Sequence, residues 1–245
     1  MPADLPTILA TSGGLTRGSR TDVAFAPLLI CAIDLAGVDA RRPRLCHIGT
    51  AGGDQRWWNA LLNEAGHAAG IDVAHLNLFP MPTVEDMAGF LLEQDVIWVS
   101  GGSVANLLAL WRLHGLDSIL AEVWRAGVVL GGVSAGSLCW HVGGTTDSFG
   151  PALRPVTNGL GLLPYANGVH YDSEPQRRPL LHQLIADGVL PDGYASDDGV
   201  GLLYRGTALV EAVTEMKGKG AYAVRRDGDR AVEDRIEPRT LPGAL

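Results

Sequence analysis

Short apolar runs alternate with amphipathic stretches over roughly the first 140 residues of the chain. The runs have the length of buried strands, and the stretches between them carry apolar residues at helical spacing. Strands are predicted at Leu5–Thr11, Arg44–Gly49, Ile71–Leu78, Asp95–Val99 and Gly127–Leu130. Helices are predicted at Asp22–Leu35, Asp54–His67, Thr83–Glu93, Ser103–Leu113 and Leu116–Arg125. This alternation predicts a three-layer α/β/α fold with a mostly parallel sheet, whose ligand crevice lies at the carboxyl ends of the strands.

The last third of the chain is patterned differently. The apolar runs Leu202–Tyr204, Ala208–Val213 and Tyr222–Val224 are separated only by turn residues, which leaves no room for helices between them. They predict an antiparallel C-terminal extension of the same sheet. No linker or repeat interrupts the chain, so we expect one domain over residues 1–245, with the tail from about residue 227 loosely held.

Charge and composition limit the kinds of partner and cofactor that the protein is expected to bind. The formal net charge of -8 disfavours nucleic acids and anionic membrane surfaces. No apolar stretch reaches the roughly 18 residues of a spanning helix, and the N-terminus lacks a signal-peptide pattern. The three cysteines are scattered and odd in number, which indicates free thiols and a cytoplasmic location. Histidines and cysteines show no ligand spacing and no nucleotide fingerprint is present, so neither a metal nor a cofactor is expected.

The strongest local pattern is Gly-Val-Ser-Ala-Gly around Ser134, which follows an apolar strand and precedes a predicted helix. A nucleophile elbow, the sharp strand-to-helix turn that exposes a catalytic serine, needs such small neighbours. We therefore predict that Ser134 is a nucleophile and that the amide of Ala135 faces the developing oxyanion. A second glycine-rich turn follows the fourth predicted strand. It is expected to supply the amide of Gly102 to the oxyanion hole and to place Gly101 and Ser103 against the substrate.

A serine nucleophile needs a base, and His170 is the histidine that ends an apolar stretch at the edge where Ser134 is expected. His141 is predicted two helical turns after Ser134 on the same helix, pointing away from the turn. The acid that orients the imidazole is either Asp147, which lies between the serine and the histidine, or Asp172, two residues after His170.

Several segments together resemble the peptidase E and cyanophycinase family of serine peptidases, within the class I glutamine amidotransferase-like superfamily. The similar segments, in order, are Pro43–Gly53, Ser100–Leu108, Gly132–Ser137, Thr145–Asp147, Gly161–Asp172 and Ser196–Gly206. The resemblance implies a serine-dependent hydrolase in which Asp147 supplies the acid and His170 the base. The chain departs from the family pattern at Ser103, where asparagine is usual, and at Val133.

The resemblance also implies cleavage of short peptides, including dipeptides with an acidic first residue. Arg177 and Arg178 follow the His170 segment and are candidates for binding the acidic group, because arginine matches a carboxylate. Two other hypotheses fit parts of the pattern. One is an α/β-hydrolase esterase, which would need a histidine later than His182. The other is a catalytically inactive domain that binds a small molecule on the same scaffold.

Overall fold

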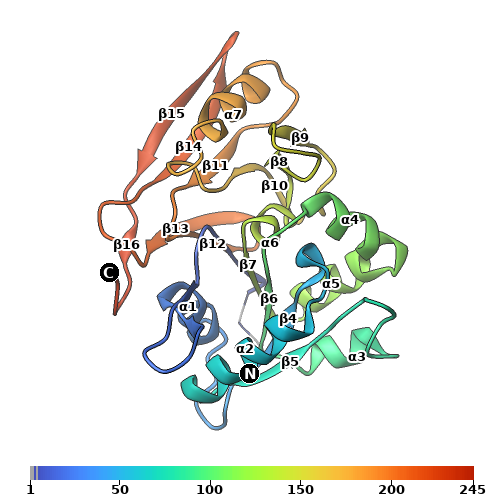
Figure 1. Cartoon of the computed structure of the whole chain (residues 1–245). Helices are drawn as coiled ribbons and strands as arrows, with labels where there is room; N and C mark the ends of the chain where they lie inside the picture. The colour runs from blue at the N-terminus through green and yellow to red at the C-terminus, as the bar shows by residue number, and fades with distance from the viewer. Residues whose placement is uncertain (1–2, 4) are drawn as a thin grey trace.

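The computed structural model describes residue 3 and residues 5–245, and these residues build two large β-sheets with helices packed against them (Figure 1). The main sheet has the strand order β16-β13-β12-β1-β7-β6-β4-β5. Its strands are β1 (Thr7–Thr11), β4 (Arg44–Ile48), β5 (Asp72–His75), β6 (Val96–Val99), β7 (Val129–Val133), β12 (Val200–Arg205), β13 (Ala208–Thr214) and β16 (Arg239–Thr240). The run from β1 to β5 is parallel, whereas β12 and β13 add antiparallel strands on the other side of β1. The predicted fold class and the antiparallel extension are therefore confirmed.

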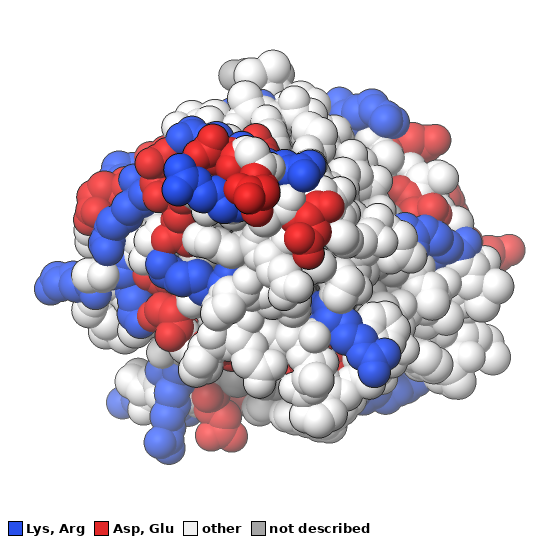
Figure 2. Space-filling model, turned by 90° about the horizontal axis from the view of Figure 1, so that it is seen from above, with Lys and Arg blue, Asp and Glu red and all other residues white. Residues whose placement is uncertain are grey.

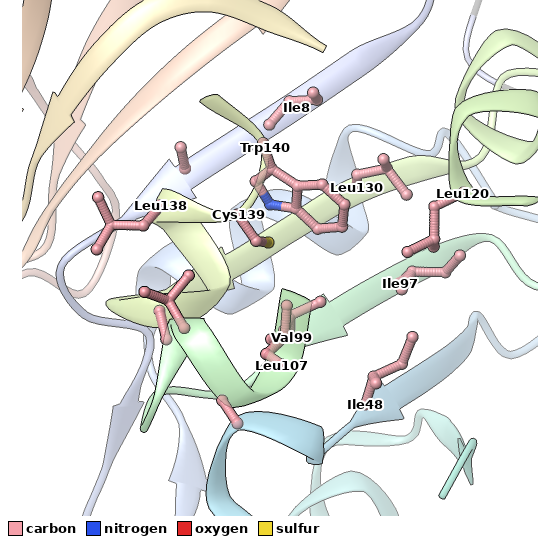
Figure 3. Packing of buried hydrophobic residues seen from close by; sticks show 14 of the residues in the cluster. Ile8, Ile48, Ile97, Val99, Leu107, Leu120, Leu130, Leu138, Cys139 and Trp140 are labelled. Atoms are coloured by element: carbon pink, nitrogen blue, oxygen red, sulfur yellow. The ribbon is translucent and has the colours of Figure 1, made fainter. Parts of the chain in front are cut away.

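Helices cover both faces of the main sheet. They are α1 (Pro27–Asp34), α2 (Arg56–Ala69), α3 (Met87–Leu92), α4 (Val104–Leu113) and α5 (Leu116–Arg125), with a 3-10 turn η1 (Thr50–Gly52) before α2. α1 packs on one face, and α3, α4 and α5 pack on the other, which holds the largest apolar cluster. Figure 3 shows Ile97, Val99 and Leu130 of the strands packed against Leu107 and Leu120 of these helices. Such burial of apolar area on both faces is what stabilises a parallel sheet.

The second sheet is a feature that the hydrophobic pattern did not predict. Its strand order is β15-β14-β11-β10-β8-β9. Its strands are β8 (His141–Thr146), β9 (Arg154–Val156), β10 (Leu163–Gly168), β11 (Gly193–Ser196), β14 (Ala221–Asp227) and β15 (Arg230–Ile236). Helix α7 (Arg177–Ala186) packs on it through Leu181, Leu184 and Ile185. Figure 1 shows this layer beside the carboxyl ends of the central parallel strands, so the second sheet flanks the predicted crevice.

Two of the predicted placements are wrong. The run Tyr222–Val224 belongs to β14 and pairs with β11, because Val224 completes the apolar cluster under α7 rather than a cluster of the main sheet. The helix after Ser134, α6 (Ala135–Leu138), is four residues long and does not reach His141, which begins β8. The tail beyond residue 227 forms β15 and β16.

Charged side chains of both signs are interleaved over the β14–β15 hairpin. Figure 2 shows them at the left of the view, beside a wide area without charged groups. The pairs Arg225–Asp234 and Arg230–Asp227 belong to this hairpin, and their exposure means that they contribute little to stability. None of the helices in the described residues is long and apolar enough to cross a membrane.

Candidate active site

Ser134 occupies a strained turn between β7 and α6. Its φ of 57° and ψ of -113° lie in a region that residues with a side chain rarely adopt. The turn is possible because its neighbours are glycines: a Cβ at Gly132 would lie 2.6 Å from the carbonyl oxygen of Val99, and one at Gly136 would lie 2.1 Å from it. The turn is anchored by the Ser134 amide, which donates to the carbonyl oxygen of Thr11 at 3.1 Å. Thus the residues around Ser134 hold its backbone tightly while its hydroxyl makes no hydrogen bond within the described chain.

The glycine-rich loop after β6 lies directly against Ser134. A Cβ added at Gly101 would be 3.7 Å from Ser134 Oγ, and Gly102 has a φ of +135° that suits only glycine. Ser103 is turned away from this contact, because its amide donates to Ala51 and its hydroxyl accepts from the Asn106 amide as the N-cap of α4.

The backbone amides of Gly102 and Ala135, the pair expected to form the oxyanion hole, donate no hydrogen bond among the described residues, and neither do those of Gly101 and Gly136. The Ala135 amide opens α6, and amides at a helix start have no partner within the helix. Gly101 brings the glycine-rich loop close to the serine, since a Cβ added there would lie 3.7 Å from Ser134 Oγ. Free amides close to a nucleophile are suited to bind an oxyanion.

His170 comes from the second sheet, just after β10. Its φ of 52° is also strained, and its amide donates to Ser12 Oγ at 3.1 Å. Because Ser12 directly follows Thr11, which accepts from Ser134, two consecutive residues at the end of β1 hold both the serine and the histidine. His170 Nδ1 lies 2.6 Å from Asp198 Oδ1, a short charge-assisted hydrogen bond. The imidazole is 23% exposed, so it borders solvent.

Neither predicted acid contacts His170 in the described part of the chain. Asp147 lies in the loop after β8 and lines a separate cavity with residues that precede α7. Asp172 accepts a hydrogen bond from the amide of Asp198 at 2.9 Å and also pairs with Lys219. Partial burial raises the pKa of Asp172, but the Lys219 ammonium and the Asp198 amide outweigh it and lower the pKa below its ordinary value. Asp172 therefore holds the segment that carries Asp198.

The sequence analysis assigned no role to Asp198, although the segment Ser196–Gly206 was one of the similar segments. The carboxylate follows β11 and reaches the histidine across the second sheet, 28 positions later in the chain. No local spacing encodes such a contact, and the signal that could have found it is the run Asp197-Asp198-Gly199 within that segment.

Arg177 and Arg178 are both engaged in contacts within the protein. The buried Arg177 donates to Glu174 at 2.7 Å and to the carbonyl oxygen of Thr145 at 2.5 Å. The Arg178 guanidinium lies 4.5 Å from the ring centroids of both Tyr171 and Tyr222 and pairs with Glu233 at 2.6 Å. These contacts tie α7 to the second sheet and leave no free guanidinium at the serine.

A second group of histidines lies at the start of the glycine-rich loop. His47 Nε2 is 2.8 Å from Ser100 Oγ, and His47 Nδ1 is 3.2 Å from His75 Nδ1. His75 in turn contacts Asn63 at 2.9 Å. Burial, followed by the charge of His75, lowers the pKa of His47 to about 3, and burial lowers that of His75 to about 4. This network of neutral groups holds Ser100, the residue before Gly101, in place.

A cavity of about 240 Å³ opens beside the serine. Gly101 and Val133, which adjoin Ser134 in space and in sequence, form one wall. Leu15, Trp57 and Trp58 supply apolar surface to the remainder. Among the described residues, no group of three or more acidic, histidine or cysteine side chains is placed to hold a metal ion.

Comparison with known proteins identifies the family of this chain. The model of peptidase family S51 matches residues 8–211. The chain is 42% identical over 183 residues to YgaJ, an uncharacterised peptidase of Bacillus subtilis (strain 168), covering 75% of this chain and 78% of the relative. The protein is thus a serine-type peptidase. It belongs to peptidase family S51, the peptidase E family, which excludes the α/β-hydrolase alternative.

Solved structures share the fold at low sequence identity. A peptidase from an acI-B1 Actinobacterium superposes with a TM-score of 0.67 at 15% identity, covering 96% of this chain and 95% of the other. A candidate peptidase E from Listeria monocytogenes EGD-e gives a TM-score of 0.59 at 16% identity, covering 95% of this chain and all of the other. Both similarities concern the fold alone.

Proposed function

We propose that the protein hydrolyses short peptides through an acyl-enzyme, with Ser134 as nucleophile, His170 as general base and Asp198 as the orienting acid. The observation that carries the assignment is the 2.6 Å contact between His170 Nδ1 and Asp198, on a histidine anchored beside the strained turn of Ser134. In this assignment Asp198 takes the role that the sequence gave to Asp147.

The first half of the reaction forms the acyl-enzyme. Because Asp198 accepts a hydrogen bond from the Nδ1–H group of His170, the other ring nitrogen, Nε2, is free to take the proton of the serine hydroxyl. Ser134 Oγ then bonds to the carbonyl carbon of the peptide. The negative charge that develops on the carbonyl oxygen is stabilised by the amides of Gly102 and Ala135.

The second half releases both products. The imidazolium of His170 donates its proton to the leaving amine, and the peptide C–N bond breaks. Water then enters, gives a proton to the same imidazole and attacks the ester carbon of acylated Ser134. The ester C–O bond then breaks, the imidazolium returns its proton to Ser134 Oγ, and the acid leaves. Asp198 remains ionised throughout and stabilises the positive imidazole.

The resemblance to peptidase E extends the proposal to dipeptides with an acidic first residue. This part rests on the resemblance, because Arg177 and Arg178 are bound within the protein rather than at the serine. A dipeptide library that includes acidic and neutral first residues tests it directly. Equal cleavage of both classes removes the acidic preference and leaves the peptidase chemistry unaffected.

A thiol nucleophile is a poor alternative at this site. Cys46 and Cys139 are fully buried, and burial raises the pKa of Cys46 to about 12 and that of Cys139 well above its ordinary value. Thiols with raised pKa values stay protonated and unreactive. Free cysteines also support our proposal that the protein works in the cytoplasm, which cell fractionation would test.

A fluorophosphonate probe combined with the dipeptide library tests the proposed function. The wild type should be labelled and should cleave peptides, and Ser134→Ala should abolish both while the fold is retained. Ser100→Ala is the matched control, since Ser100 also lies beside a histidine, and it should still be labelled. Labelling that survives Ser134→Ala but disappears in Ser100→Ala would transfer the nucleophile role to Ser100.

A further inference from the structure

We propose that the cavity beside Ser134 binds a large uncharged apolar side chain of the residue on one side of the scissile bond. The inference rests on the proposed function, because it assigns a specificity pocket to that peptidase site. It is carried by the position of the cavity, by the chemistry of its walls and by the absence of a free cation on the described residues that line it.

The position of the cavity links it to the reacting bond. Val133 directly precedes Ser134, and Gly101 packs so closely on Ser134 that an added Cβ would lie 3.2 Å from the serine Cβ. A peptide whose carbonyl carbon sits on Ser134 Oγ therefore has a neighbouring side chain within reach of this cavity. Its volume of about 240 Å³ has room for one large side chain.

The chemistry of the walls favours an apolar occupant. Trp57 is 61% exposed, and its ring meets that of Trp58 edge to face with the centroids 5.5 Å apart. Gln55 holds this edge in place, because its side-chain amide donates to the carbonyl oxygen of Gly52 at 3.1 Å and accepts from the Trp57 indole. An exposed aromatic surface held in a fixed orientation gains stability when an apolar side chain covers it.

A carboxylate side chain would bind unfavourably in the same cavity. No lysine, arginine or histidine lines it among the described residues, so a buried carboxylate would lose its hydration without gaining a partner. The two arginines considered for binding an acidic group, Arg177 and Arg178, do not line the cavity and are paired with Glu174 and Glu233. The cavity therefore discriminates against acidic side chains, whatever residue occupies the other side of the bond.

Gly52 offers a way to fill the cavity without straining the backbone. It lines the cavity, and a Cβ added there would meet only the carbonyl oxygen of Gly101, at an ordinary contact distance of 3.7 Å. Gly52→Leu should thus occupy the space meant for the substrate side chain. Trp57→Ala is the complementary change, because it removes apolar surface from the cavity wall instead of filling the cavity.

The experiment measures kcat/KM for two dipeptide series, one that varies the first residue beside a constant alanine and one that varies the second. For the wild type, leucine and phenylalanine should exceed glycine and aspartate by about 10- to 100-fold in one of the two series. Gly52→Leu and Trp57→Ala should each reduce that ratio by about 10-fold or more. Leu113→Ala, which removes another exposed apolar side chain at the far end of α4, should leave the ratio unchanged.

The outcomes separate the two proposals. Ser134-dependent cleavage with no apolar preference in either series overturns the pocket assignment and leaves the peptidase function standing. An apolar preference that survives both Gly52→Leu and Trp57→Ala also overturns the assignment, because the selecting surface then lies elsewhere. If no peptide in either series is cleaved in a Ser134-dependent way, the proposed function fails and the pocket assignment fails with it.

Discussion

His170, the proposed base for Ser134, and His47, which contacts Ser100, differ in what surrounds the imidazole ring. His170 borders solvent and contacts the carboxylate of Asp198 at 2.6 Å. His47 is 1% exposed, and its ring contacts the uncharged groups of Ser100 and His75. The first histidine thus has a carboxylate beside it, whereas burial lowers the pKa of the second and keeps its ring neutral.

This difference shows that a short serine–histidine distance does not by itself make a catalytic pair. A general base must become positively charged during the reaction, so it needs a nearby negative group or access to water. Burial instead lowers the pKa of His47 to about 3, which keeps the ring neutral and suits it to hold Ser100 next to Gly101. The backbone supports the same division, since Ser134 and His170 have strained positive φ values and Ser100 does not.

The largest expected effect comes from removing each histidine in turn. His170→Ala should lower kcat by about 10⁴- to 10⁶-fold, as Ser134→Ala should, and the double variant should be no worse because the two act as a unit. His47→Gln should lower kcat by about 10-fold or less, since its side chain only positions the loop. Steady-state kinetics on one cleaved dipeptide measures all four proteins. Equal losses for His170→Ala and His47→Gln would contradict the comparison.

The next prediction distinguishes the three aspartates considered as the orienting acid. Asp198→Asn should lower kcat by about 10⁴-fold with the fold intact, because an amide cannot stabilise the imidazolium. Asp172→Asn should have a smaller effect, since it acts through the amide of Asp198. Asp147→Asn serves as the control and should stay within a few-fold of wild type. A crippled Asp147→Asn with an active Asp198→Asn would restore Asp147 as the orienting acid.

A smaller effect is expected from breaking the buried pair. Ser100→Ala leaves a buried ring nitrogen of His47 without its hydrogen-bond partner, which should lower the free energy of unfolding by about 1–3 kcal/mol. Denaturant unfolding measures the loss. Ser103→Ala is a matched control in the same loop, and it should cost only about 1 kcal/mol through the lost N-cap of α4. No loss of stability in Ser100→Ala would show that the contact with His47 is not structural.

The smallest expected effect is the pH dependence of the free energy of unfolding. His47, His75 and His141 have pKa values lowered by burial to about 3, about 4 and about 4, whereas an unfolded histidine binds a proton near pH 6.5. Between these values the unfolded chain binds more protons than the folded protein. Stability should therefore be fully present above pH 6.5 and fall as the pH is lowered, by up to about 1.4 kcal/mol per pH unit for each histidine.

The His47→Gln variant isolates the buried pair within that pH dependence. Its free energy of unfolding, measured in denaturant between pH 5 and pH 7, should depend on pH less steeply than that of the wild type, by about one bound proton. An unchanged slope would mean that His47 takes up a proton in the folded protein as readily as in the unfolded chain.

The parallel core and the turn at Ser134 could be predicted from the sequence. Both depend on local patterns: apolar runs of strand length give β4, β6 and β7, and glycines on either side of the serine permit its strained φ. The loop after β6 was recognisable for the same reason. In each case neighbours in sequence fix the conformation, so the pattern is visible before folding.

Which side chains meet at the site depends instead on how distant segments pack together. Asp198 reaches His170 because β10 and β11 are adjacent strands of the second sheet, and His47 reaches Ser100 because β4 and β6 pair in the main sheet. Asp147 was favoured as the acid because it lies between the serine and the histidine in the sequence. In the structure it lies in a loop that lines a separate cavity. Burial keeps His47 neutral, and Arg178 contacts Tyr222. Both features arise from packing between distant segments, so they cannot be predicted from local patterns in the sequence.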